Sequence, residues 1–129
     1  MQAIESNSMP AKLLVVDNEK DVCNFVKSFF KMRGFDVLTA FNGDEALKVL
    51  ESVRPDLVIL DVVMGTEREG IDYLPKIKKS SPDSKVIMIT GVDDKDIVDE
   101  AKKLGADDYI TKPLVLEGLE RAILGQVKK

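Results

Sequence analysis

The chain has 129 residues, a net charge of −4 and 44% hydrophobic residues, which fits one globular domain and argues against nucleic-acid binding by that domain. It contains no histidine and one cysteine, Cys23, which excludes Ser-His-Asp and Cys-His catalysis, histidine-based zinc sites and internal disulfides. Any metal would be held by oxygen ligands, which favours Mg²⁺, Ca²⁺ or Mn²⁺.

The beginning of the chain is polar and has no signal-peptide pattern. We expect a flexible N-terminal tail over residues 1–10 and one folded domain over residues 11–129. No apolar run approaches the roughly 18–20 residues of a membrane span. These observations predict a cytoplasmic protein that does not bind a membrane.

In the first half, short apolar strands alternate with segments of helical periodicity. A strand is predicted over residues 12–17 and a helix over residues 19–33. The next strand, over residues 35–40, mixes polar and apolar side chains, as an edge strand does. A helix over residues 43–53 follows, and Asn42 is its expected N-cap.

The second half continues this alternation. Strands and helices are predicted in turn over residues 56–61, 70–79, 85–90, 94–104, 107–111 and 114–127. Pro75 in the third helix is expected to be tolerated only near the first turn. Strict alternation with short connections implies right-handed crossovers, and therefore an open, doubly wound α/β fold with five parallel strands covered on both faces.

Four of these strands run into polar residues, Asp17, Asp61, Thr90 and Lys112. The carboxyl ends of parallel strands converge on one edge of a sheet, where such sheets bind ligands. Two neighbouring carboxylates repel each other and call for a cation. A hydroxyl and an ammonium group can contact phosphoryl oxygens. The strand ends therefore predict a phosphate-handling site.

Each of these residues also has a plainer interpretation. Asp17 or Asn18 would be a good cap for the following helix. Asp61 would be an exposed turn residue, Thr90 part of a simple turn, and Lys112 a solvated surface charge. Taken one at a time, the residues leave these alternatives open.

The order of the motifs is more specific than any one of them. The stretches are LVVDNE at 14–19, PDLVILD at 55–61, Met64, Gly70, VIMITG at 86–91 and GADDYITKP at 105–113. In this order they resemble the receiver domain of two-component response regulators, and the resemblance covers residues 12–126. It implies a flavodoxin-like (βα)5 fold with strand order 2-1-3-4-5.

By this resemblance Asp61 is the phosphoacceptor. Asp17, Asn18 and Asp61, together with the main-chain carbonyl of Val63, would form the Mg²⁺ pocket. The family usually carries a second acidic residue where this chain has Asn18, whose amide oxygen can bind Mg²⁺ but supplies no charge. We therefore expect a lower Mg²⁺ affinity than usual, unless Glu19 compensates.

The same resemblance makes Thr90 and Tyr109 the paired switch residues, although a single aromatic residue on a strand is as often a packing residue. It implies that Lys112 contacts the acyl phosphate. Pro113, which follows Lys112, is a candidate for a cis peptide bond that would aim Lys112 inward. Val63 and Val92 occupy positions that influence attack of water on the acyl phosphate. Because their side chains are apolar and cannot orient water, autodephosphorylation is expected to be slow.

The loop after Asp61 departs from the family pattern. Gly65 stands where the family commonly has proline, and residues 65–69 make the loop one residue longer than usual. Glu67, Arg68 and Glu69 are expected to form a solvated charged loop, with partner contact as the less favoured alternative.

The resemblance implies a phosphorylation-activated signalling domain, and not an enzyme beyond Mg²⁺-dependent self-catalysed phosphotransfer and autodephosphorylation. The phosphoryl donor would be a sensor histidine kinase or a phosphotransfer protein. The face formed by residues 94–104, 107–111 and 114–127 would contact a downstream target, an output domain or a second copy in a phosphorylation-linked dimer.

One alternative is a degenerate receiver that acts as a constitutive interaction module. A phosphatase with an aspartate nucleophile usually needs a carboxylate where this chain has Val63.

Overall fold

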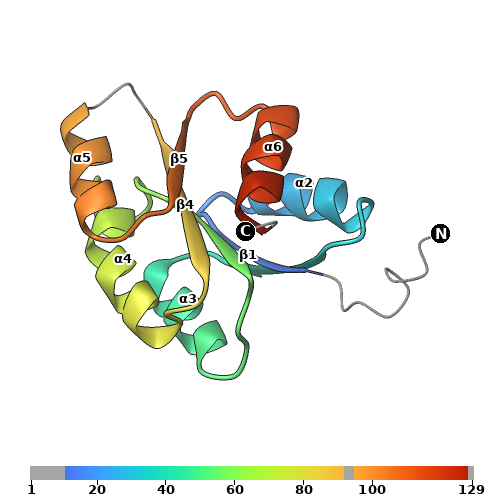
Figure 1. The fold of residues 1–129 in the computed structure, drawn as a ribbon, viewed down its shortest axis with the longest axis horizontal. Coiled ribbons are helices and arrows are strands. Elements are labelled where there is room, and N and C mark those ends of the chain that lie inside the picture. The colour runs from blue at the N-terminus through green and yellow to red at the C-terminus, as the bar shows by residue number, and fades with distance from the viewer. Residues whose placement is uncertain (1–10, 92–94, 128–129) are drawn as a thin grey trace.

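Five parallel strands form one sheet in the computed structural model, which describes residues 11–91 and 95–127 (Figure 1). The elements are β1 Lys12–Val16, α2 Lys20–Lys31, β2 Asp36–Ala40, α3 Gly43–Leu50, β3 Leu57–Asp61, α4 Glu69–Ser80, β4 Lys85–Thr90, α5 Lys95–Lys103, β5 Asp108–Thr111 and α6 Leu116–Val127. The tail predicted over residues 1–10 lies outside the described residues. Among the described helices, none is long and apolar enough to cross a membrane.

The strands lie in the order β2-β1-β3-β4-β5, and every neighbouring pair is parallel, which confirms the predicted doubly wound fold and strand order. The mixed strand β2 lies at an edge, as its composition predicted. Val16 of β1 pairs with Leu60 of β3, and Leu60 pairs with Met88 of β4. The carboxyl ends of these strands therefore meet at one edge of the sheet.

Side chains alternate between the two faces of the sheet, and each face carries its own apolar cluster. Figure 1 shows α3, α4 and α5 on one face and α2 and α6 on the other. The first cluster contains Leu14, Val58, Met88, Leu50 and Leu74, and the second contains Leu13, Ile59, Ile87, Phe30 and Leu119. Because β1, β3 and β4 are covered on both faces, their sequences are continuous apolar runs.

Local residues determine where α3 begins and where α2 ends. The side chain of Asn42 caps α3 as predicted, accepting a hydrogen bond from the Glu45 amide at 2.8 Å. Helix α2 ends at Lys31, earlier than the predicted Arg33, and Gly34 follows with φ of 88°. This left-handed conformation is one that glycine adopts readily.

Pro75 lies within α4, beyond its first turn, so the expectation that it must lie near the helix start was wrong. Proline removes one backbone hydrogen bond from a helix. Helix α4 buries Ile71, Leu74 and Ile77 against the sheet. Full burial of each such side chain contributes roughly 1.5–3 kcal/mol, so packing outweighs the missing bond.

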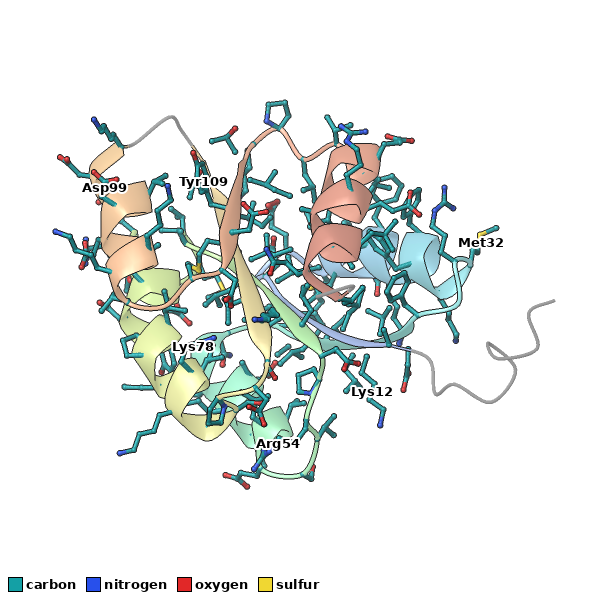
Figure 2. All side chains as sticks on the ribbon, in the orientation of Figure 1. Lys12, Met32, Arg54, Lys78, Asp99 and Tyr109 are labelled. Atoms are coloured by element: carbon teal, nitrogen blue, oxygen red, sulfur yellow. The ribbon has the colours of Figure 1, made fainter. Side chains whose placement is uncertain are left out.

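A polar network closes the amino-terminal ends of β4 and β5. Lys78 donates to the Ser84 carbonyl at 3.1 Å and lies 3.3 Å from Asp107 Oδ2. The same carboxylate oxygen accepts the Val86 amide at 2.8 Å. The buried hydroxyls of Ser81 and Ser84 are 2.6 Å apart. In Figure 2 Lys78, a residue of α4, lies towards the end of the sheet opposite the strand carboxyl ends. These polar groups are thus paired with one another.

Gly70 allows the start of α4 to approach the end of β3 closely. Its amide donates to the Val62 carbonyl at 2.9 Å. A Cβ atom at this position would lie 2.1 Å from the Asp61 carbonyl oxygen and 2.7 Å from Val62 Cα. Both are backbone atoms, so the segment that carries Asp61 would have to shift.

Gly70→Ala is therefore expected to lower the free energy of unfolding by about 1–3 kcal/mol, the usual cost of overpacking. Gly125→Ala is the matched control, because Gly125 lies in α6 with nothing within 4 Å of its added Cβ. That change should stabilise the protein by roughly 0.5–1 kcal/mol. Urea unfolding of both variants measures the difference, and equal stability of Gly70→Ala and the wild type would contradict this account.

Candidate functional site

Asp61 is the last residue of β3, and its side chain is buried, with 2% of the residue exposed. Lys112 Nζ lies 3.1 Å from Asp61 Oδ2. No hydrogen-bond donor in the described part of the chain contacts Oδ1, which is also buried. A buried carboxylate oxygen without a partner is costly, so this position is suited to a further donor or a cation.

Asp17 follows directly after β1 and is also buried. Burial raises the pKa of the Asp17 carboxyl above its usual value, and the negative charge of Asp61 raises it further. The Glu19 amide and the Lys112 ammonium lower that pKa without cancelling the rise. Two carboxylates from neighbouring strands thus share one site with a single nearby ammonium group.

The capping alternative for Asp17 and Asn18 was wrong. Glu19 occupies the N-cap position of α2, and no side chain caps the helix there. Asp17 Oδ1 does accept the Glu19 amide at 2.9 Å, which fixes the carboxylate in place.

The buried Cys23 thiol donates to the Asp17 carbonyl at 3.3 Å, and burial raises the pKa of that thiol to about 11. Cys23 is therefore a packed, unreactive side chain.

Asn18 and Glu19 are exposed at the rim of this site. Glu19 lines a cavity of about 170 Å³ together with Asp17 and Lys112. The remaining lining residues are Val15, Val16, Val22, Val26, Ile59, Ile89, Pro113 and Leu114. The structure therefore brings Glu19 to the same hollow as two of the site's charged groups.

The described residues contain no group of three His, Cys, Asp or Glu side chains placed to hold a metal. They do offer two carboxylates, of Asp17 and Asp61, and one buried oxygen that lacks a partner. Mg²⁺ is commonly bound by one or two carboxylates and keeps several waters, so this oxygen-only donor set fits it. Asn18 follows Asp17 directly in the chain, and Val63, which is 46% exposed, lies two residues after Asp61.

Thr90 is buried at the end of β4, and its carbonyl accepts the Lys112 amide at 2.8 Å. Tyr109 is 38% exposed, and Lys102 Nζ of α5 lies 5.2 Å from the centre of its ring. Figure 2 shows Tyr109 on the side of β5 that faces α5. Since Tyr109 pairs with Met88, two residues before Thr90, both side chains lie on the same face of the sheet.

The Lys112–Pro113 peptide bond is cis. Lys112 reaches Asp61 from β5, across β4, which separates β5 from β3. The structure thus brings Asp17, Asp61 and Lys112 together, with Thr90 at the end of the strand between the last two. Val92, expected to influence water attack, lies outside the described residues.

The charged loop after β3 is not simply solvated, as the sequence had suggested. Glu69 accepts the Gly65 amide at 2.8 Å with Oε1 and the Gly43 amide at 2.9 Å with Oε2. Arg68 Nη2 lies 2.6 Å from Glu100 Oε2 of α5. Sequence reasoning named both residues but missed these contacts, because Gly43 and Glu100 lie far away in the chain and no local pattern marks them.

Comparison with known proteins places this geometry in a family. A family model described as the response regulator receiver domain matches residues 13–124. The chain belongs to this family. It is a receiver domain of two-component signalling, the class of domain that is switched by phosphorylation.

The relatives of this receiver domain differ in length. The chemotaxis protein CheY of Listeria monocytogenes is 40% identical over 116 residues, covering 86% of this chain and 97% of CheY. The alkaline phosphatase synthesis transcriptional regulatory protein PhoP of Bacillus subtilis is 36% identical over 105 residues, covering 81% of this chain and 43% of PhoP. The chain thus matches nearly all of the first relative and less than half of the second.

A solved structure also resembles this receiver domain. It is a response regulator from Burkholderia pseudomallei with a phosphorylated aspartic acid, a calcium ion and citrate. The TM-score is 0.81 at 27% identity, and the match covers 87% of this chain and 65% of that chain.

The raised pKa of Asp17 gives a testable pH dependence. Asp17→Asn keeps an oxygen that can accept the Glu19 amide and removes the buried charge, so it should raise the urea midpoint of the metal-free protein at pH 7. A raised pKa means that the folded state takes up the proton first as the pH falls. The cost of the charge, and with it the advantage of the variant, should therefore shrink as the pH falls through the raised pKa towards the unfolded value of 3.8.

Urea unfolding with a chelator present, from pH 7 down to pH 4, measures this difference. Asp83→Asn controls for a change of one charge at an exposed position. An advantage of Asp17→Asn that stays constant across this range would contradict the account.

Proposed function

We propose that Asp61 of this receiver domain accepts a phosphoryl group, with Mg²⁺, from the phosphohistidine of a sensor kinase or phosphotransfer protein. The observation that carries the proposal is the buried Asp61 carboxylate, which has Lys112 on one oxygen and no donor on the other among the described residues. The Burkholderia relative, which contains a phosphorylated aspartic acid, supports the same reaction class.

In the proposed reaction an Asp61 oxygen forms a bond to phosphorus while the bond from phosphorus to the donor imidazole nitrogen breaks. That nitrogen keeps the bonding electron pair and takes up a proton. The donor imidazole must lie outside the 129 residues of this chain, because they contain no histidine. The Lys112 ammonium, 3.1 Å from Asp61 Oδ2, is placed to attract the incoming phosphoryl oxygens.

Mg²⁺ would be held by Asp17, Asp61, the Asn18 amide oxygen and the Val63 carbonyl, with Glu19 as a compensating acid at the rim. When bound, the ion neutralises negative charge on the phosphoryl group and the two carboxylates. The calcium ion of the Burkholderia relative supports a divalent ion in this fold. Asp17 would serve this site as a carboxylate ligand of the ion.

The proposed output is a change in the face formed by α5, β5 and α6. Phosphorylation adds roughly −1.5 to −2 charge units, which draw in the Thr90 hydroxyl and favour movement of the Tyr109 ring away from Lys102. That face would then bind a downstream protein, an output domain or a second copy. The net charge of −4 supports protein partners for this domain, and its proposed location is the cytoplasm. PhoP is named a transcriptional regulator, but it is a longer protein than this chain.

Incubation with acetyl phosphate and Mg²⁺ should add the mass of one phosphoryl group, and Asp61→Asn should abolish the addition. Intact-mass spectrometry measures both. The reason is that the substituted amide lacks the nucleophilic carboxylate while keeping the size of the side chain. A wild type that gains no mass, yet still binds its partner, would instead support the constitutive interaction module.

Asn18→Asp should raise the affinity for Mg²⁺ by roughly tenfold, because ligand charge tunes the affinity of hard cations and tenfold corresponds to about 1.4 kcal/mol. Isothermal titration calorimetry with MgCl₂ measures the change. Glu19→Gln is the companion variant. If Asn18→Asp brings no gain while Glu19→Gln weakens binding, Glu19 supplies the missing charge and the expectation of weak binding is wrong.

A further inference from the structure

The Glu69 carboxylate joins two backbone segments that are far apart in the sequence. One oxygen accepts the Gly65 amide at 2.8 Å, in the loop that follows β3. The other accepts the Gly43 amide at 2.9 Å, at the start of α3. We propose that Glu69 is a positioning residue, which holds this loop in the shape that turns the Val63 carbonyl towards the metal pocket. The inference deepens the proposed function and rests on it.

Other contacts of this loop fix its beginning and its end. Its beginning is held at Val62, whose amide donates to the Ile89 carbonyl at 3.0 Å and whose carbonyl accepts the Gly70 amide at 2.9 Å. Beyond Val63, the Met64 amide donates to the Thr66 carbonyl at 3.1 Å. That turn lies within the loop and does not tie it to the rest of the protein. The Met64 side chain is buried in the first apolar cluster, the Glu69 amide donates to the Thr66 carbonyl at 3.5 Å, and Arg68 pairs with Glu100 of α5. Among these ties, the bond from the Gly65 amide to Glu69, the first residue of α4, is the one that also connects, through the same carboxylate, to α3.

The contact at Gly65 leaves no room for a side chain while Glu69 holds its present place. A Cβ atom there would lie 2.7 Å from Glu69 Oε1, so any larger residue would displace the carboxylate. This gives a physical reason for glycine at a position where the family commonly has proline. A proline there would also lack the amide hydrogen that Glu69 accepts.

The second contact anchors Glu69 to a rigid element. Gly43 lies at the amino-terminal end of α3, where a negative charge is favoured by the helix dipole. The same helix end is packed on α4, because the Tyr73 hydroxyl bonds to Asp44 and a Cβ at Gly43 would lie 2.3 Å from the Tyr73 ring. Hydrogen bonds to a carboxylate are stronger than those between neutral groups. Glu69 therefore ties the loop to the junction of α3 and α4.

Glu69→Gln tests this role with almost no change of shape. A carboxylate accepts with both oxygens, whereas an amide presents one oxygen and one NH₂ group. One of the two backbone amides, Gly65 or Gly43, would then face a donor. Glu67→Gln is the matched control, since Glu67 is exposed in the same loop and makes no hydrogen bond or ion pair within the described residues.

The experiment follows the ¹⁵N-labelled 129-residue chain by NMR during a titration with MgCl₂ and no phosphodonor. Glu69→Gln should shift the Gly65 and Gly43 amide signals and weaken Mg²⁺ binding on the order of tenfold, at the lower end of the contribution of outer-shell partners. Glu67→Gln should do neither. The rate of labelling by acetyl phosphate should fall in Glu69→Gln at limiting Mg²⁺ and recover at saturating Mg²⁺, which general destabilisation would not produce.

Gly65→Ala provides a second test if Glu69→Gln does not fold, because it breaks the same contact from the other side. Equal Mg²⁺ affinity of wild type and Glu69→Gln, or of wild type and Gly65→Ala, would overturn the inference even if Asp61 is phosphorylated. A wild type that binds no Mg²⁺ would overturn it as well. A further outcome is that acetyl phosphate fails to label the wild type while Glu69→Gln still binds Mg²⁺ more weakly than the wild type does. That result would support the positioning role and reject the proposed phosphoryl transfer.

Discussion

Two carboxylates buried at the ends of adjacent parallel strands are the constraint on which the rest of this structure depends. Asp17 and Asp61 lose most of their hydration, repel each other and have one ammonium group, that of Lys112, near them. Such an arrangement lowers the stability of a fold, because removing a charge from water costs several kcal/mol unless it is well paired. In the proposed function, the same deficit would give the site its affinity for a cation and for a phosphoryl group that arrives with one. Function here depends on polar groups that the protein alone does not satisfy.

The remainder of the domain offsets that cost. Apolar clusters cover both faces of β1, β3 and β4, so the strands that carry the carboxylates are held by packing along their whole length. At the opposite end of the sheet, Lys78, Ser84 and Asp107 satisfy one another. Gly70 lets α4 begin directly against the Asp61 backbone. Polar groups are thus hydrogen-bonded to one another at the amino-terminal ends of β4 and β5. At the carboxyl end of β3, one buried oxygen of Asp61 has no partner among the described residues.

Much of this could be read from the sequence, because its signals are local. Apolar runs, helical spacing and the Asn42 cap identify elements, and the convergence of parallel strands brings Asp17, Asp61 and Lys112 to one edge. The failures have physical causes. Burial of α4 overrode the cost of Pro75. The partners of Glu69 and Arg68 are set by how helices pack across loops, and Gly43 is 26 positions away from Glu69. Neither composition nor periodicity encodes such contacts.

The ring of Tyr109 lies outward, with Lys102 above its face at 5.2 Å. A cation–π contact at an exposed site is worth about 0.5–1 kcal/mol, which corresponds to a population ratio of only about two to five. Salt and substitution of Lys102 act directly on that ratio, since both partners are open to solvent. The contact with Lys102 is therefore only a weak restraint on the orientation of the ring.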